Sequence, residues 1–484
     1  MQREQIIARL QSANAPFDVL IIGGGATGFA CAVDALSRGY SVALIERGDF
    51  GEGTSSRSTK LIHGGVRYLR QGNIHLVRES LRERSWFFRA ASHLVHPLEF
   101  IIPCRSRISQ WYYRAGMGVY DAMAHPPPHE HARVLSREEV VARSPGCATQ
   151  FLAGGVRYMD GQFDDARMII CFLRHVIETG GFPLNYAAAV ELIKERGRVV
   201  GVMVEDRETG RVFPVKARAV INATGVAVDA VCRMDGQLEN KVTSSQGIHL
   251  VLDQSFLGGT SALMIPGTSD GRVLFAIPWH GRVLFGTTDT PWPDSSREPK
   301  PMEEEIEYLL NHGAKVFRQA PVRTDVKGMF AGLRPLPKPH GNKKTSAISR
   351  DFRIDVSGSR LVSVYGGKWT TCRAMGQAGV DQAVRAGGLP VRTSQSQQII
   401  FTTGMEPESH LQPPNRLWVL HAVRNEMARN LDDLLLRRVR LGVLDHEAAM
   451  ETAPDCARWM AEALMKNQAW IQEQCAAWGK TSGA

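Results

Sequence analysis

The chain has 484 residues, 43% of them hydrophobic, and a formal net charge of +9 at pH 7. This length allows two or three domains, and the charge favours anionic partners such as phosphate compounds, nucleic acid or acidic lipid. The basic residues are scattered without a nucleic-acid motif, and the eight cysteines show no CxxC or metal-ligand spacing. We therefore expect no nucleic-acid partner, no metal site, and unpaired thiols in a reducing compartment.

No apolar run reaches about 18 residues, so we expect no membrane-spanning helix. The N-terminal stretch MQREQIIARLQSANAPF has no apolar core of the length that a signal peptide needs.

The stretch Asp18–Arg47 predicts a dinucleotide-binding βαβ unit. Gly23 permits a tight turn, Gly25 lets the backbone approach a pyrophosphate, and Gly28 lets helix and strand pack closely. Glu46 stands where an acceptor for ribose hydroxyls is expected. The parts of this unit are, in order, an apolar strand (Val19–Ile22), the glycine turn (Gly23–Gly28), a helix (Phe29–Arg38) and a second strand (Val42–Ile45).

The segments that follow predict a discontinuous, mixed architecture. In chain order they are helical patterns over 74–91, an aromatic amphipathic helix over 106–124, a helix over 163–180, paired strands at Asn185–Glu195 and Val199–Glu205, a strand at Ala219–Gly225, a strand-rich region over 242–290, a helix over 302–320, a strand at Leu361–Lys368 with a helix opening at Thr370, and three or four helices over 417–478.

This order favours FAD over NAD. An NAD domain normally continues with consecutive βα units, whereas here a Ser/Thr-rich loop follows the second strand. The third cofactor-type strand, Val220–Gly225, comes far downstream. The last strand ends in Gly366-Gly367 before a helix, and such a turn offers backbone donors to an anionic group such as a flavin.

A set of ordered motifs resembles FAD-dependent glycerol-3-phosphate dehydrogenase, in the glycine/D-amino-acid oxidase superfamily. The motifs are SSRSTKLIHGGVRYL (Ser55–Leu69), GQFDDAR (Gly161–Arg167), VINATG (Val220–Gly225), IPWHGRVLFGTTDT (Ile277–Thr290), AGLRPL (Ala331–Leu336), SRDF (Ser349–Phe352) and VYGGKWTTCR (Val364–Arg373). The resemblance covers roughly residues 17–380, and a weaker resemblance covers residues 422–445. It implies an α/β fold in which a FAD-binding Rossmann-like domain is interleaved with a mixed-sheet substrate domain, followed by a C-terminal helical domain.

The expected boundaries follow from the motifs and the pattern of elements. They are 17–105, 166–241 and 346–386 for the FAD-binding domain, 106–165 and 242–345 for the substrate domain, 387–416 for a linker, and 417–484 for the helical domain.

The resemblance implies oxidation of sn-glycerol 3-phosphate to dihydroxyacetone phosphate. Hydride would pass from C2 to N5 of a non-covalently bound FAD, and electrons would pass on to ubiquinone or menaquinone. Arginine and lysine suit a phosphate monoester, and histidine suits proton transfer near neutral pH. His63 is the candidate base or alcohol-orienting residue, and Arg334 is the candidate group that stabilises the developing alkoxide. His249 is a second candidate for the proton, and the sequence leaves this choice open.

The remaining site residues are assigned by the same motifs. For the substrate they are Arg67, Tyr68, His249, Arg350 and Lys368. For FAD they are Glu46 at the adenosine ribose, Gly23, Gly25 and Gly28 at the pyrophosphate, Thr54, Ser55, Ser58, Thr59 and Lys60 beside the pyrophosphate and flavin, Gly225 near the adenine, and Gly367, Lys368 and Thr370 near the isoalloxazine ring.

Three departures leave the exact substrate open. The segment 387–416 is shorter than the corresponding region of the family, which predicts a trimmed helical cap. Val226-Ala227 stands where relatives typically carry Pro-Trp, and Gln246 stands where some relatives have lysine. A related polyol phosphate such as an erythritol phosphate is the alternative substrate, and oxygen is the alternative acceptor. A flavin-dependent protein that binds nucleic acid, or an inactive FAD-binding scaffold, fits the motifs less well.

A quinone acceptor would place the protein on a membrane surface without spanning it. The stretch Ile108–Met123 is the candidate surface, because its apolar and aromatic residues lie beside Arg105, Arg107 and Arg114. Its alternatives are a helix packed on its own domain or a dimer contact. The expected location is the cytoplasm, peripherally at the inner face of the cytoplasmic membrane, with a homodimer expected by analogy alone.

Overall fold

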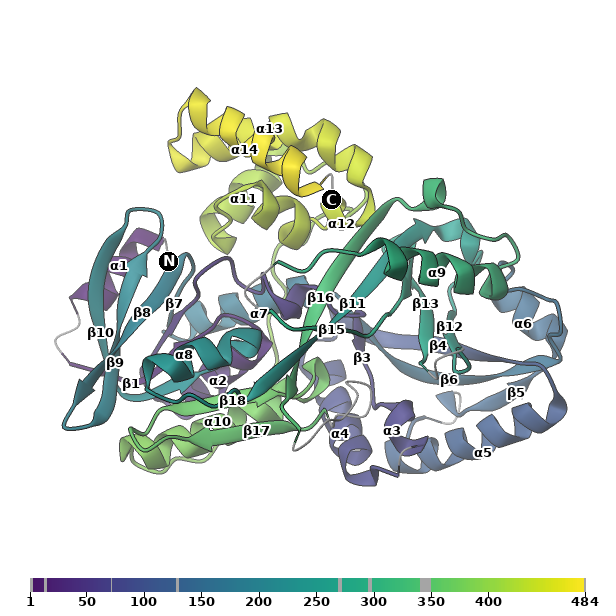
Figure 1. Ribbon diagram of the computed structural model, residues 1–484, viewed down its shortest axis with the longest axis horizontal. Helices are drawn as coiled ribbons and strands as arrows, with labels where there is room; N and C mark the ends of the chain where they lie inside the picture. The colour runs from purple at the N-terminus through teal and green to yellow at the C-terminus, as the bar shows by residue number, and fades with distance from the viewer. Residues whose placement is uncertain are drawn as a thin grey trace.

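The computed structural model describes residues 3–12, 15–70, 72–127, 130–268, 272–294, 298–339 and 350–482. Two sheets stand side by side with helices packed on them, and the C-terminal helices, in yellow, lie above both in Figure 1. The expected α/β fold, with a Rossmann-like unit, a mixed-sheet unit and a C-terminal helical unit, is confirmed.

The first sheet carries the predicted βαβ unit. Its central strands run parallel in the order β18-β10-β1-β2-β7, and β17 pairs antiparallel with β18 at one edge. The strands are β1 (Phe17–Ile22), β2 (Val42–Ile45), β7 (Phe182–Leu184), β8 (Ala187–Glu195), β9 (Arg198–Asp206), β10 (Arg211–Asn222), β17 (Phe352–Val356) and β18 (Val362–Gly366). Helices α2 (Ala26–Ser37), α7 (Asp165–Glu178) and α10 (Cys372–Gly387) pack against it.

Both faces of the first sheet are covered, which explains why β1 and β2 are almost continuous apolar runs. The long strand β10 serves two neighbours: its first half pairs antiparallel with β9, and its second half pairs parallel with β1. The predicted strand pair over 185–205 is therefore present as the antiparallel pair β8–β9. Helix α8 (Val228–Met234) follows the turn after β10, and α1 (Arg3–Gln11) lies near β7 and β10.

The second sheet is mixed, since β12 and β4 pair parallel and the other strands pair antiparallel. Its strands are β3 (Leu61–Ile62), β4 (Val95–Cys104), β5 (Arg133–Leu135), β6 (Gly154–Phe163), β11 (Val242–Asp253), β12 (Ala262–Ile265), β13 (Leu274–Trp279), β14 (Arg282–Gly286), β15 (Thr290–Trp292) and β16 (Gly328–Pro337).

Each face of the second sheet has its own apolar core. Helices that contribute to these cores or to their edges are α3 (Val66–Arg70), α4 (Ile74–Ala90), α5 (Arg107–Ala124), α6 (Arg137–Arg143) and α9 (Glu303–Val316). Met117 and Tyr120 of α5 are buried in one core, and Ile306 and Leu309 of α9 in the other.

The chain enters the second sheet earlier than the expected boundary at residue 105. Strands β3 and β4 lie within 17–105, yet both pair with β6 in the second sheet. The local pattern of a strand records which residues are buried but not which strand will pair with it, so this assignment depends on tertiary structure.

The segment 387–416 is packed against the first unit rather than hanging free of it. Phe401 is buried against Trp86 and Phe172, and the Ser396 carbonyl accepts a hydrogen bond from Trp86 Nε1. The C-terminal elements that follow are α11 (Arg416–Glu426), a π-helical turn (Asp433–Arg438), α12 (Leu441–Leu444), α13 (His446–Leu464) and α14 (Gln468–Ser482).

A buried ion cluster ties these C-terminal helices to the first unit. The Asp49 carboxylate, directly after β2, accepts hydrogen bonds from Arg437 and Arg438 at 2.5 to 2.8 Å. All three side chains are almost fully buried. The helical unit is therefore held against the loop that leads into the candidate site.

Candidate active site

A cavity of about 440 Å³ is lined by residues of both sheets. From the first sheet it receives the carboxyl ends of β1, β2, β10 and β18, and from the second it receives parts of β11 and β16. The carboxyl ends of parallel strands are where ligands bind in open α/β sheets. The predicted residues that line it are Gly23, Gly25, Glu46, Thr54, Ser55, Ser58, Thr59, His63, Gly225, His249, Arg334, Arg350, Gly367, Lys368 and Thr370.

The glycine turn after β1 leaves no room for side chains at two of its positions. Gly23 has φ +110°, and a Cβ there would lie 2.6 Å from the Ala223 carbonyl oxygen. A Cβ on Gly28 would lie 1.8 Å from the Gly23 carbonyl oxygen, so helix α2 packs directly on the turn. Gly28 itself does not line the cavity. Gly25 is the N-cap of α2 and makes no side-chain cap. The Ala26 amide donates to Ser55 Oγ, and the N-terminus of α2 faces the cavity as an anion site.

Glu46 is fixed by the backbone at the end of β2. Its two carboxylate oxygens accept hydrogen bonds from the Gly24 and Gly48 amides at 2.7 and 3.0 Å. Burial raises the pKa of this carboxyl, and the two amide donors act against that rise. Each carboxylate oxygen can accept a further hydrogen bond, so Glu46 retains the capacity to bind hydroxyl groups from the cavity.

The Ser/Thr-rich loop after β2 joins the two units. The Thr54 hydroxyl donates to the Leu333 carbonyl at 2.6 Å, and Thr59 Oγ1 lies 3.1 Å from His249 Nε2. The Ser55 hydroxyl accepts a hydrogen bond from the Ala26 amide at the start of α2. These contacts hold the loop against both β16 and β11 along the wall of the cavity.

Lys60 was expected beside the cofactor, but its amine points to the opposite side of the loop. Lys60 Nζ is 2.7 Å from Asp165 Oδ2 and donates to the Ser56 carbonyl. The side chain is buried and does not line the cavity. Burial and the nearby Arg440 guanidinium lower the pKa of Lys60 to about 7, while Asp165 acts in the other direction. Lys60 therefore stabilises the loop from behind.

The Gly366-Gly367 turn lies next to His63, which directly follows β3. Both glycines have φ +77°, a conformation that favours glycine. The Thr370 hydroxyl donates to the His63 carbonyl and accepts from the His63 amide, at 3.3 and 3.2 Å. Trp369 Nε1 donates to the Ser55 carbonyl at 2.8 Å. The turn, His63 and the loop after β2 are thus held together around the cavity.

Three cations gather in this part of the site. The Arg334 guanidinium, on β16, donates to Gln246 O, Thr287 Oγ1 and Thr288 O at 2.9 to 3.2 Å. Burial lowers the pKa of Arg334 to about 10, and Arg350 adds to this effect. Burial and Arg350 also lower the pKa of Lys368 to about 8.

Lys368 Nζ donates to Ser80 Oγ at 2.8 Å and lies 4.4 Å from the centre of the Tyr68 ring. Among the described residues, neither Lys368 nor Arg350 forms an ion pair. Positive charges that repel one another in a cavity and form no ion pair are suited to binding an anion.

Both candidate histidines are held neutral. Burial lowers the pKa of His63 to about 4 and lowers that of His249 well below its usual value, where Lys60 and Arg334 add to the effect. The His249 ring stacks on Phe330, and its Nδ1 atom has no hydrogen-bond partner in the described part of the structure. A neutral imidazole can accept a proton, so both residues can act on a substrate hydroxyl.

Three other assignments have different outcomes. Tyr68 does not line the cavity but lies beneath the Lys368 amine, and the Arg67 side chain lies outside the described residues. Gln246 points away from the cavity, because its Nε2 atom donates to Glu305 on α9 at 2.7 Å. Gln246, at the position where some relatives have lysine, therefore faces α9 and not the cavity.

Several residues of the site were not predicted from the sequence. Thr287 and Thr288 orient Arg334, and Asp289 Oδ1 lies 3.8 Å from it. The signal was the motif GTTDT, which had been noted as a whole without a role for its members. Ala187, Ala188 and Ala189 also line the cavity, but small apolar residues on a strand give no local sign of a binding role.

These features fit FAD. The dinucleotide turn has a glycine at Gly23, helix α2 begins after Gly25 at the cavity wall, and Glu46 has spare acceptor capacity. The Gly366-Gly367 turn and the unpaired His249 Nδ1 face the same cavity. No helix within the described ranges is long and apolar enough to cross a membrane.

Comparison with known proteins agrees with this site. The family model for FAD dependent oxidoreductases matches residues 18–382, and a model for the C-terminal domain of alpha-glycerophosphate oxidase matches residues 342–471. A Caenorhabditis elegans protein named as a probable mitochondrial glycerol-3-phosphate dehydrogenase is 34% identical over 96% of this chain and 72% of its own length. The human mitochondrial glycerol-3-phosphate dehydrogenase is 38% identical over 84% of this chain.

The chain spans 58% of the length of the bovine and human relatives. Among solved structures, the glycerol-3-phosphate dehydrogenase from Bacillus halodurans complexed with FAD aligns with a TM-score of 0.80 and 25% identity, over 99% of this chain and 97% of that one. L-alpha-glycerophosphate oxidase from Mycoplasma pneumoniae shares the fold, with a TM-score of 0.62 at 17% identity. The chain belongs to the FAD-dependent oxidoreductases, in the family of the glycerol-3-phosphate dehydrogenases.

Proposed function

We propose that the protein oxidises sn-glycerol 3-phosphate to dihydroxyacetone phosphate. The observation that carries this proposal is the group of three cations, Arg334, Arg350 and Lys368, in the same cavity as two neutral histidines. Of the three, only Arg334 has an acidic partner among the described residues, Asp289 at 3.8 Å. A phosphate monoester is the anion that arginine and lysine together bind well, and an adjacent secondary alcohol would then lie within reach of the imidazoles.

The protein side chains have three tasks in this reaction. The cations bind the phosphate and fix the substrate, and His63 or His249 accepts the proton that leaves the C2 hydroxyl. Arg334 is held in place by carbonyl and hydroxyl oxygens on one side. Its positive charge stabilises the negative charge that develops on the oxygen that becomes the ketone. When bound, FAD supplies the electron acceptor and would take the hydride from C2 at N5.

The test is anaerobic mixing of the FAD-loaded protein with sn-glycerol 3-phosphate while the flavin absorbance is recorded. Rapid bleaching supports the proposal, and no bleaching by any polyol phosphate rejects it. Bleaching by an erythritol phosphate alone would keep the chemistry and change the substrate.

The electron acceptor is a separate question. We propose a membrane quinone, because the fold relative with FAD and the curated relatives are named dehydrogenases. The match of residues 342–471 to the C-terminal domain of an oxidase favours oxygen as the second candidate. Rapid reoxidation of the bleached flavin by a quinone analogue, with slow reoxidation by air, supports the quinone, and the opposite order supports oxygen.

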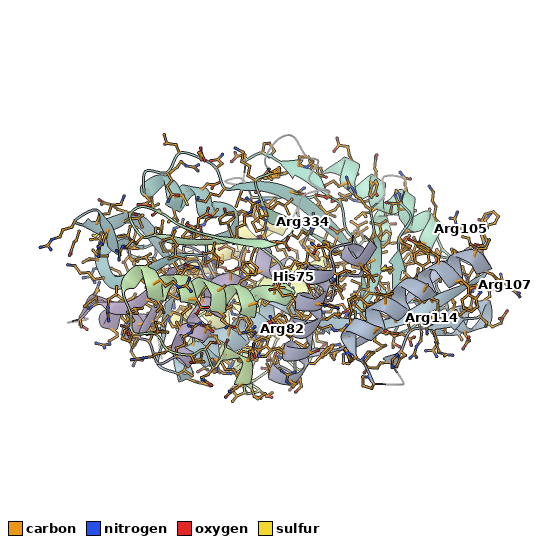
Figure 2. The ribbon with its side chains drawn as sticks, turned by 90° about the horizontal axis from the view of Figure 1, so that it is seen from below. His75, Arg82, Arg105, Arg107, Arg114 and Arg334 are labelled. Atoms are coloured by element: carbon orange, nitrogen blue, oxygen red, sulfur yellow. The ribbon has the colours of Figure 1, made fainter. Side chains whose placement is uncertain are left out.

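A quinone acceptor requires contact with lipid, and helix α5 offers the surface for it. Its outer face carries the exposed side chains Ile108 (83% exposed), Trp111 (70%), Tyr112 and Val119, spaced as one helical stripe. Figure 2 shows Arg105, Arg107 and Arg114 along the same exposed edge of the molecule. Apolar and aromatic residues beside arginines suit an anionic lipid interface. We propose peripheral attachment here, at the inner face of the cytoplasmic membrane.

Sedimentation with vesicles that contain anionic lipid tests this attachment. The double variant Trp111→Ser, Tyr112→Ser is expected to lose vesicle binding while its flavin is still reduced by substrate. The control is Leu238→Ser, which removes an apolar side chain that is 87% exposed outside α5. Equal vesicle binding by all three proteins would reject α5 as the membrane surface.

A further inference from the structure

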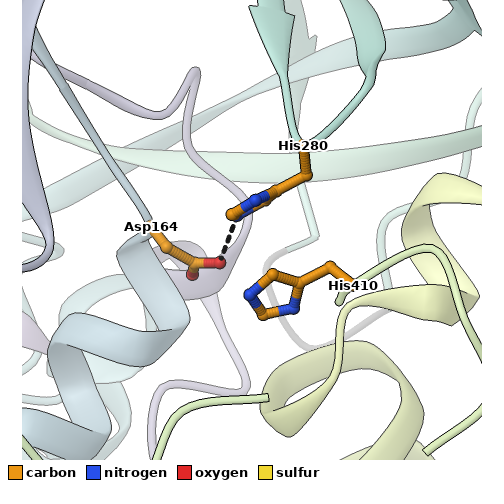
Figure 3. A group of neighbouring side chains, drawn as sticks. All are labelled: Asp164, His280 and His410. Atoms are coloured by element: carbon orange, nitrogen blue, oxygen red, sulfur yellow. Dashed lines mark hydrogen bonds and ion pairs between the residues drawn. The ribbon is translucent and has the colours of Figure 1, made fainter. Parts of the chain in front are cut away.

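Three potential metal ligands meet outside the cavity, at the junction of the three parts of the molecule. Figure 3 shows Asp164, His280 and His410 with their polar atoms turned toward one another. One ligand atom from each residue lies within 4.8 Å of the other two. Asp164 precedes α7 of the first unit, His280 lies at the tip of the β13–β14 hairpin of the second sheet, and His410 lies in the segment that leads to the C-terminal helices.

Asp164 is a fixed and ionised ligand. Its Oδ1 atom caps α7 by accepting hydrogen bonds from the Ala166 and Arg167 amides at 3.0 Å, which leaves Oδ2 turned toward the histidines. Burial alone would raise the pKa of this carboxyl, but Arg440 and His280 lower it well below its usual value.

The His410 ring has the tautomer that a metal ligand needs. Its Nδ1 atom hydrogen-bonds to the Val439 carbonyl, which can only accept, so Nδ1 carries the proton and the lone pair is at Nε2. Metal-binding histidines typically donate their second ring nitrogen to a carbonyl in this way.

His280 completes the set from the opposite side. Its Nε2 atom lies 3.2 Å from Asp164 Oδ2, and its ring centre lies 4.1 Å from that of His410. Its side chain is 31% exposed, so a cation and a water ligand can reach the group from solvent. In this contact Nε2 donates its proton to Asp164 Oδ2, because a carboxylate only accepts. A metal ion would take the place of that proton, with His280 in the Nδ1–H tautomer.

We propose that Asp164, His280 and His410 form a binding site for a divalent transition-metal ion of the Zn²⁺ class. Two imidazoles and one carboxylate, with water as a fourth ligand, are a donor set that Zn²⁺ accepts in tetrahedral geometry. Bonds of about 2.0–2.2 Å require ligand atoms about 3.4 Å apart, so the widest pair has to close by at most about 1.4 Å. The nearest cation, Arg440, pairs with Asp165 at 2.8 Å, and its Nε atom also lies 3.6 Å from Asp164 Oδ2, so a metal ion would replace this second, longer contact.

The metal would act as a clamp. It would join the start of α7, the β13–β14 hairpin and the segment 387–416. These three segments lie far apart in the sequence. Asp165, the residue after Asp164, holds Ser58 and Lys60 of the loop behind the cavity. The clamp therefore fixes the element on which that loop depends, and it serves stability rather than the redox step.

The FAD-loaded protein is first treated with a chelator and then titrated with Zn²⁺, and calorimetry measures both the binding and the unfolding temperature. Co²⁺ is used as a second probe because its visible absorption reports tetrahedral coordination. The variants are His280→Gln and His410→Gln, and Asp164→Asn, which keeps the helix cap. The matched control is His131→Gln, since His131 also faces a carboxylate, with Nδ1 3.6 Å from Asp121 Oδ2, but belongs to no three-ligand group among the described residues.

We expect one equivalent of Zn²⁺ to bind the parent protein and His131→Gln and to raise the unfolding temperature of both. Each of the three site variants should bind at least about tenfold more weakly and lose the thermal shift. Absence of saturable binding to the parent overturns the proposal, as does unchanged affinity in His280→Gln. That variant lies at a partly exposed hairpin tip, so it keeps the test valid if His410→Gln fails to fold.

Discussion

Lys368 offers a direct test of the proposed phosphate site through the pH dependence of catalysis. Burial and Arg350 lower the pKa of its ammonium group to about 8. Below pH 8 the group is charged and attracts the phosphate, and above pH 8 it becomes neutral. Because kcat/KM reports ionisations of the free enzyme, we expect it to fall as the pH rises through about 8.

The size of the effect follows from the lost interaction. A hydrogen bond to a charged group is worth about 1.5–3 kcal/mol, which corresponds to about 10- to 150-fold in kcat/KM. Lys368→Met should therefore lower kcat/KM by this factor at pH 7 and remove the decrease near pH 8. Lys368→Arg should keep the charge at alkaline pH and shift the decrease upward, because a guanidinium group stays protonated there.

Stopped-flow reduction of the flavin under anaerobic conditions, measured from pH 6 to pH 10, gives the required profiles. Lys216→Arg serves as the control, since Lys216 is exposed and pairs with Glu195 far from the cavity. If Lys368→Arg retains the decrease at pH 8, another group titrates there and the assignment of Lys368 to the phosphate is refuted.

Three further changes test other parts of the structure. Arg334→Gln should lower kcat/KM by about 10- to 150-fold with an unchanged flavin spectrum; unaltered stopped-flow kinetics would remove Arg334 from the substrate site. Gly28→Ala places a Cβ 1.8 Å from the Gly23 carbonyl oxygen and should yield protein without flavin, as judged by the ratio of flavin to protein absorbance. The control Gly116→Ala has open space around the new Cβ and should retain the flavin. A normal flavin content in Gly28→Ala would contradict the packing argument. Phe401→Ala should cost about 3–5 kcal/mol and lower the calorimetric unfolding temperature; an unchanged temperature would mean that segment 387–416 packs only loosely.

Much of the fold was predictable because its signals are local. The helix expected over 106–124 is α5 (Arg107–Ala124), and the strand, glycine turn and helix that begin at Val19 occur as expected in β1 and α2. Apolar periodicity and glycine turns depend on the backbone and on nearest neighbours in sequence, so a single chain displays them. The partners of β3 and β4 were not predictable, since a strand's own residues do not specify which sheet it joins.

The same division applies to the site. His63, Arg334 and Lys368 were named from motifs, and the structure brings them to one cavity from three distant segments. The role of Lys60 could not be read from its motif, because its partner Asp165 is more than a hundred residues away. The sequence shows which side chains carry a charge. Whether a charged side chain faces a ligand or a buried carboxylate depends on the packing around that side chain.

The sequence by itself determined the dinucleotide-binding unit, the preference for FAD, and the identity of the residues available for an anionic alcohol, because these depend on short contiguous patterns. Only the tertiary structure decided which of those residues share a cavity, and how burial and mutual repulsion set the pKa values of Arg334 and Lys368. It also brought together Asp164, His280 and His410, since ligand groups built from three distant segments have no spacing that a sequence can show. Electrostatic and metal-binding properties depend on distances in space, and those distances exist only once the chain has folded.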